Sequence, residues 1–206
     1  SPDPAPRAPY LAPMDTYRNF HHLSLNAREG ADFEIEYADR NSRILLAAPH
    51  GGRIEPHTGA LAGQIAGDIF SCYTFRGIRP KNNRALHLTS HCFDEPRALA
   101  AVAAAEIVIT IHGSDSRSPS DILLGGLHRP LREEMEACLA EAGFSAGFAT
   151  SAMEGVHPRN LCNRGRQGKG LQLELNPGLR QMLRHSAAKG RRFANAVRKV
   201  LCRHEH

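Results

Sequence analysis

The sequence predicts a single α/β domain, built on a mixed, mostly parallel sheet with helices on both faces. Short apolar runs alternate with helical patterns along the chain, as in α/β proteins. Two of these runs, 43–48 and 107–111, are almost wholly apolar, as expected for strands that are buried on both faces of a parallel sheet. A chain of 206 residues is also the right length for one hydrophobic core.

The strands begin at residue 33, where Phe33, Ile35 and Tyr37 alternate with polar residues, as at the edge of a sheet. Ile107 to Ile111 is the clearest central strand of the chain. The complete set of expected strands is 33–37, 43–48, 72–75, 85–89, 107–111, 147–150 and 171–175.

Helices are expected between these strands. Pro56 would open one in which Leu61, Ile65 and Ile69 recur every four residues. Asp94 would cap a helix over the alanine-rich segment 96–105. The remaining expected helices run from Pro130 to a terminating Gly143, over 177–185, and over 191–202.

The first 13 residues differ from the rest of the chain. Five prolines in 1–13 predict an extended N-terminal arm, and residues 14–206 are assigned to the domain. No apolar run is long enough for a membrane span, so no membrane partner is expected. The chain does not begin with methionine, so its compartment stays open, and secretion after removal of a leader is one interpretation. Five widely spaced cysteines exclude a disulfide-dense scaffold but leave their pairing open.

The net charge of +5 indicates either ordinary surface charge or attraction to a polyanion. Much of the excess lies near the C-terminus, which keeps a basic nucleic-acid-binding, replication-associated protein as one alternative. Only 6% of the residues are aromatic, none is tryptophan, and no helix-turn-helix is visible, so nucleic acid is the less favoured partner.

Polar residues with metal-binding chemistry follow two of the buried strands. His50 and Glu55 come directly after strand 43–48, and His112 comes directly after strand 107–111. Because the carboxyl ends of parallel strands meet at one edge of a sheet, these side chains can converge. Two histidines and one glutamate, with one open position, are a usual ligand set of hydrolytic zinc sites. The sequence therefore predicts Zn²⁺ bound by His50, Glu55 and His112.

Glu174 is the candidate general base. It lies near the carboxyl end of strand 171–175, between Leu173 and Leu175. A carboxylate in an apolar strand is costly unless it has a task, and a hydrolase needs a base that does not bind the metal.

At this point three segments resemble the poly-γ-glutamate hydrolase family, whose best-known members are phage-encoded. The resemblance rests on His50-Gly51-Gly52-Arg53-Ile54-Glu55, on Ile111-His112-Gly113, and on Gly170-Leu171-Gln172-Leu173-Glu174-Leu175. It implies a zinc-carboxypeptidase-like fold, zinc on His50, Glu55 and His112, and Glu174 as the base. It also implies hydrolysis of γ-glutamyl amide bonds in poly-γ-glutamate or a related polyanionic polymer.

An anionic substrate needs cationic and hydrogen-bonding partners, and arginine suits carboxylates because its fork binds them with two hydrogen bonds. Arg180 opens the helix after Glu174, and Arg164 and Asn163 lie in a loop over 163–170. These three are the candidate substrate-binding residues.

Another substrate for the same metal chemistry stays open. A small-molecule deacylase, or a carboxypeptidase of peptidoglycan fragments, would need the same metal and base. The mode of cleavage and the oligomeric state also stay open.

Overall fold

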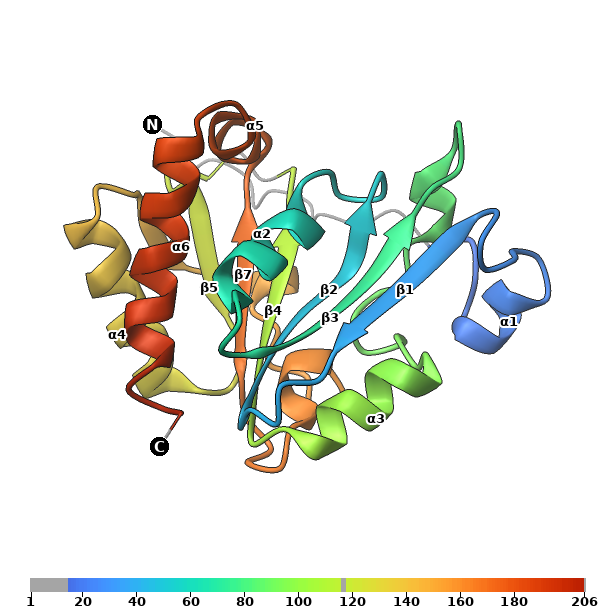
Figure 1. The fold of residues 1–206 in the computed structure, drawn as a ribbon, viewed down its shortest axis with the longest axis horizontal. Helices are drawn as coiled ribbons and strands as arrows, with labels where there is room; N and C mark the ends of the chain where they lie inside the picture. Colours follow the sequence, from blue (N-terminus) through green and yellow to red (C-terminus); the bar gives the residue numbers. More distant parts are fainter. Residues whose placement is uncertain (1–14, 116–117, 206) are drawn as a thin grey trace, which may run out of the picture.

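A seven-stranded sheet forms the centre of the protein in a computed structural model, which describes residues 15–115 and 118–205 (Figure 1). The predicted arm at 1–13 lies outside the described residues. The strands, in sheet order, are β1 (Phe33–Ala38), β3 (Ser71–Gly77), β2 (Ile44–Gly52), β4 (Ile107–Gly113), β7 (Leu171–Leu175), β5 (Ile122–Gly125) and β6 (Ala146–Phe148).

The four central strands of the sheet are parallel, and an antiparallel strand lies next to them at each end. β3, β2, β4 and β7 run in one direction, whereas β1 lies antiparallel to β3 and β5 lies antiparallel to β7. β6 pairs in parallel with β5. The predicted fold class, one α/β domain with a mixed, mostly parallel sheet, is confirmed.

Helices cover both faces of the sheet, as predicted. One core packs the odd-numbered isoleucines of β4 and the odd-numbered leucines of β7 against α2 (Thr58–Ala66), α4 (Arg129–Glu141), α5 (Pro177–His185) and α6 (Ala187–Leu201). The core on the other face includes Val108 of β4 and residues of α1 (Phe20–Ser24), α3 (Pro96–Ala104) and the 3₁₀ turns η1 (Asn83–Leu86) and η3 (Leu161–Arg164). A third 3₁₀ turn, η2, spans Ser151–Met153.

The expected strand at 85–89 is wrong. Its first residues belong to η1, and His87 N–H donates to Arg84 O to close that turn. Leu86 and Leu88 are nevertheless fully buried. Buried leucines can alternate with other residues in a packed loop as well as in a strand. The pattern at 85–89 therefore indicated which side chains are buried, but not whether the segment pairs in the sheet.

Several boundaries and one cap also differ from the prediction. α2 begins at Thr58 and not at Pro56, because His57 has a left-handed backbone with φ of 80° that a helix cannot continue through. α3 is capped by Glu95, whose carboxylate accepts from Ala98 N–H, while Asp94 instead accepts from Phe20 N–H. The last helix begins at Ala187, four residues before the predicted start.

β5 and α1 were not expected from the sequence. β5 has four residues and all are buried, so it gives no alternation by which to recognise it. No helix among the described residues is long and apolar enough to cross a membrane. The five cysteines, all within the described residues, are free thiols.

Candidate metal centre

The carboxyl ends of β2 and β4 bring together the three predicted metal ligands. His50 and His112 lie on β2 and β4, and Glu55 follows in the turn between β2 and α2, where Glu55 N–H donates to His50 O. Gly52 makes this turn possible, because its φ is 66° and a Cβ there would lie 2.4 Å from Gly77 O. Glu55 therefore lies in a tight turn, and not directly before a helix opened by Pro56 as expected from the sequence.

A shift in strand register decides which way His50 points. Ile44, Leu46 and Ala48 of β2 face the core beneath α2, and simple alternation would send His50 to that side. The pairing of β2 with β3 shifts between Ala48 and Gly51. A shift of this kind re-aims a side chain. His50 consequently lies with Leu88 and Phe93, on the same face of the sheet as His112.

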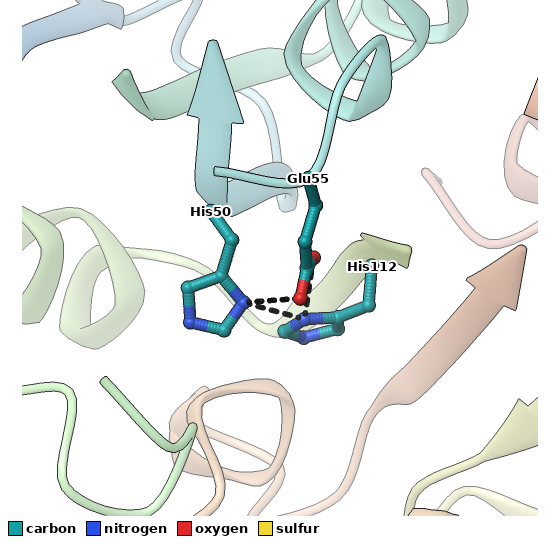
Figure 2. A group of neighbouring side chains, drawn as sticks. All are labelled: His50, Glu55 and His112. Carbon is teal, nitrogen blue, oxygen red and sulfur yellow. Dashed lines mark hydrogen bonds and ion pairs between the residues drawn. The ribbon is translucent and has the colours of Figure 1, made fainter. Parts of the chain in front are cut away.

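Figure 2 shows the three side chains directed toward one point. His50 Nδ1 lies 3.1 Å from His112 Nδ1 and 3.2 Å from Glu55 Oε1, and His112 Nδ1 lies 3.7 Å from Glu55 Oε2. Tetrahedral zinc with bonds of about 2.0–2.2 Å separates its donor atoms by about 3.3–3.6 Å. The three side chains therefore offer donor atoms of the kind that zinc binds, and one donor atom from each lies within 4.8 Å of the others.

Neighbouring groups fix the orientation of these donors. His50 Nε2 lies 2.7 Å from Leu88 O, which can only accept, so the Nε2 proton is held there and Nδ1 keeps its lone pair for a metal. Gly113 N–H donates to Glu55 Oε2 at 2.8 Å. Ser90 Oγ lies 3.3 Å from His112 Nε2. Each candidate ligand thus has a second contact that restricts its rotation.

Without a metal, the buried cluster shifts the pKa of each member. Burial lowers the pKa of His50 to about 4, which keeps its imidazole neutral. Burial alone would raise the pKa of Glu55, but His50 and His112 hold it well below its ordinary value. Burial alone would lower the pKa of His112, but Glu174 and Glu55 raise it. The site thus favours an ionised Glu55 and a neutral His50, the forms that bind metal.

Glu174 lies opposite His112 in the pairing of β4 with β7. Both side chains point away from the core beneath α5, since Leu173 and Leu175 face that core. Burial raises the pKa of Glu174 to about 7, against the opposing attraction of His112. The pairing therefore places beside His112 a buried carboxyl group whose pKa is raised when no metal is bound.

His87 forms a wall of the site that the sequence did not reveal. Its ring lies 4.0 Å from the ring of His50, centre to centre, and its Nε2 lies 3.7 Å from Glu55 Oε1. Asp15 holds the other nitrogen, Nδ1, at 2.6 Å and also accepts from Thr89 N–H. Asp15 is 72 residues away in sequence, so no local pattern could have indicated this pair.

The side chain of Arg180 extends from α5 to the edge of the sheet at which His112 lies. Its side chain is buried, and its Nε and Nη1 donate to Leu175 O and Pro56 O at 3.2 and 3.1 Å. The guanidinium lies so close to Gly113 that a Cβ on that residue would be 2.6 Å from Arg180 Cζ. The attraction of Arg180 also contributes to the pKa of Glu174, which it lowers.

Asn163 and Arg164 are placed differently. Asn163 is buried, and its side chain accepts from Leu127 and Gly170 N–H and donates to Gly155 and His157 O. These four hydrogen bonds use both acceptor sites and both donors of the amide, so the side chain serves to hold loops together. Arg164 donates weakly to Phe93 O at 3.4 Å. The next residue, Gly165, packs on Ala105 O and Glu106 O, at the opposite end of β4 from His112.

Part of the basic C-terminal charge has local partners. Arg198 donates to Ile65 O and Gln64 O at the end of α2. Lys199 and Arg203 pair with Glu141 and Glu134. This segment is therefore less available to a polyanion than its charge count indicates.

The chain is similar to known proteins in sequence and in structure. The family model described as poly-gamma-glutamate hydrolase matches residues 17–201. The SPbeta prophage-derived UPF0714 protein YoqZ of Bacillus subtilis (strain 168) is 36% identical over 164 residues, which are 79% of this chain and 59% of YoqZ. The chain thus spans somewhat more than half of that relative.

Two solved structures are similar over nearly their whole length. A bacteriophage poly-gamma-glutamate hydrolase has a TM-score of 0.87 and 28% identity, covering 93% of this chain and 98% of the phage protein. A zinc-free structure of YndL has a TM-score of 0.82 and 30% identity, covering 94% of this chain and 100% of that protein. With the family match over 17–201, these likenesses show that the chain belongs to the poly-gamma-glutamate hydrolase family.

Proposed function

We propose that this protein is a zinc-dependent amidohydrolase that cleaves γ-glutamyl amide bonds in poly-γ-glutamate or a related acidic polymer. The observation that carries the proposal is the convergence of His50, Glu55 and His112, with donor atoms 3.1–3.7 Å apart. The solved structure of the relative YndL is described as zinc-free, which implies that YndL can also bind zinc, and this supports zinc as the metal here. The family supports poly-γ-glutamate as the substrate.

His50 Nδ1, Glu55 and His112 Nδ1 would hold the metal. When bound, zinc would supply a Lewis acid that polarises the scissile carbonyl group and activates a water molecule. The remaining tasks, moving a proton and holding the substrate, fall to the side chains around it.

Glu174 would move the proton. It takes one from the attacking water and later delivers it to the leaving nitrogen, as a general base and then a general acid. A C–O bond forms at the carbonyl carbon, the C–N bond breaks, and the products are a carboxyl group and an amine.

Arg180 would hold a carboxylate of the substrate. Its bonds to Leu175 O and Pro56 O fix the plane of the guanidinium. We assign its other N–H groups to a substrate carboxylate, because a fixed guanidinium loses little freedom when it binds one. Arg164 and Asn163 stay weaker candidates, since Asn163 is engaged with backbone groups and Arg164 starts from the far end of β4.

The test compares two substitutions at the site. His112→Ala should lose zinc and activity together, because it removes a ligand. Glu174→Gln should keep zinc and lose at least about a hundredfold in kcat, since general acid–base catalysis is typically worth about 10²–10⁴ in rate. Glu106→Gln makes the same change at the other end of β4 and serves as the control.

Zinc content is measured by metal analysis, and cleavage by the new amino termini released from poly-γ-glutamate. Loss of zinc in Glu174→Gln would make Glu174 a ligand. Full activity in that variant would contradict the mechanism. A zinc protein that cleaves small amides but not the polymer would contradict the assigned substrate.

A further inference from the structure

A second side chain of β7, Gln172, is bonded to the proposed base. Gln172 and Glu174 share one face of the strand, and Gln172 is almost fully buried. Gln172 Nε2 donates to Glu174 Oε1 at 2.8 Å, and Gln172 Oε1 accepts from Asn160 Nδ2 at 3.0 Å. The three residues therefore form one chain of hydrogen bonds that ends on the carboxylate.

Backbone groups fix the direction of this chain from both sides. Asn160 Oδ1 accepts from Cys162 N–H at 3.2 Å, and a backbone N–H can only donate, so the amide nitrogen of Asn160 must face Gln172. Gln172 Nε2 also lies 3.3 Å from Met153 O, which can only accept. Both amides are thus held in the one orientation in which Gln172 donates to Glu174.

A donor held in this way fixes the plane of a carboxylate, because Oε1 is held and the group can no longer rotate freely. A base must be aimed at the proton that it takes.

We propose that Gln172, oriented by Asn160, is a positioning residue that holds the carboxylate of Glu174 aimed for catalysis. The proposal rests on the proposed function, in which Glu174 is the base. The plainer alternative is that Gln172 only fills and satisfies a buried position between β7 and the loop at Met153. The two interpretations differ in whether the effect of Gln172 passes through Glu174.

A double-mutant cycle separates them. Gln172→Met keeps the length of the side chain and removes the donor, and it is made in the wild type and in Glu174→Gln. Loss of a hydrogen-bonding partner that orients a metal ligand typically costs about 10- to 100-fold, and Gln172 stands in the same relation to Glu174. We expect a loss of that size in kcat on poly-γ-glutamate in the wild type, with zinc content unchanged. In Glu174→Gln the further loss should be less than about twofold, because the group that Gln172 positions is already gone.

Two more variants keep the test sharp. Asn160→Ser retains an oxygen that can accept from Cys162 N–H but removes the donor to Gln172. It should lower kcat in the same direction by a smaller factor, and again only when Glu174 is present. Thr110→Val is the matched control, because Thr110 is buried and faces Gln172 across β4 and β7 without a bond to Glu174. It should keep wild-type kcat.

The outcomes are distinguishable. An equal loss of kcat from Gln172→Met in both backgrounds, or no loss in the wild type, would overturn the positioning role and leave the proposed function intact. Full activity in Glu174→Gln itself would remove both. If Gln172→Met melts at the assay temperature, Asn160→Ser carries the same comparison by itself.

Discussion

The contact between Gly113 and Arg180 gives the sharpest prediction about the site. In Gly113→Ala the new Cβ would lie 2.6 Å from Arg180 Cζ and 2.9 Å from Nε and Nη1. Ordinary contact begins at 3.4 Å, so the guanidinium would have to withdraw by about 0.8 Å. Gly113 does not have a positive φ, so alanine adds no backbone strain there.

The cost of Gly113→Ala in stability and activity follows from the hydrogen bonds that Arg180 would lose. It donates to Leu175 O and Pro56 O at 3.2 and 3.1 Å, and a hydrogen bond from a charged group contributes about 1.5–3 kcal/mol. The loss of one of the two should lower the melting temperature by roughly 3–12 °C in a domain of this size. Displacement of a substrate-positioning group by about 1 Å can lower kcat/KM by about a hundredfold.

Thermal unfolding and cleavage of poly-γ-glutamate measure these two effects. Gly178→Ala is the matched control, because its Cβ would meet only Asn176 Oδ1, at 3.5 Å. In Arg180→Ala, adding Gly113→Ala should cause no further loss of melting temperature, since the group that it displaces is gone. Equal behaviour of Gly113→Ala and Gly178→Ala in both assays would refute the reasoning.

Two further predictions concern pH and charge. Burial raises the pKa of Glu174 from 4.5 to about 7, so the folded metal-free protein binds this proton more tightly than the unfolded chain. Ionisation of Glu174 therefore lowers the free energy of unfolding. This loss is absent below about pH 4.5 and complete above about pH 7, where it reaches roughly 3 kcal/mol, since each pKa unit corresponds to about 1.36 kcal/mol. Metal-free Glu174→Gln should therefore exceed the wild type in urea resistance at pH 8 but match it near pH 4, and an equal difference at both pH values would contradict this. Arg180→Ala should lower kcat/KM on the polymer more than Arg203→Ala, because the side chain of Arg203 pairs with Glu134 of α4. Capture of the polymer by the wild type should weaken as salt rises. Equal effects of the two arginine substitutions would remove Arg180 from the binding site.

Sequence patterns were enough to predict the fold class and the edge of the sheet at which the candidate site lies. The apolar runs of β2, β4 and β7 identify strands buried on both faces, and parallel strands bring their carboxyl ends together. The four candidate residues lie after those runs or near their ends. Their positions along the chain were therefore enough to predict that His50, Glu55, His112 and Glu174 lie close together.

Tertiary structure alone decided the direction of His50 and the partners behind the site. Alternation along β2 assigns His50 to the wrong face, and only the register shift against β3 brings it to His112. That shift depends on pairing with another strand, which a single strand's sequence does not encode. Asp15, Leu88 and Asn160 reach the site from 72, 38 and 12 residues away from their partners His87, His50 and Gln172. Such contacts come from the packing of separate segments, because hydrophobic periodicity reports which side of an element is buried but not which polar group it meets.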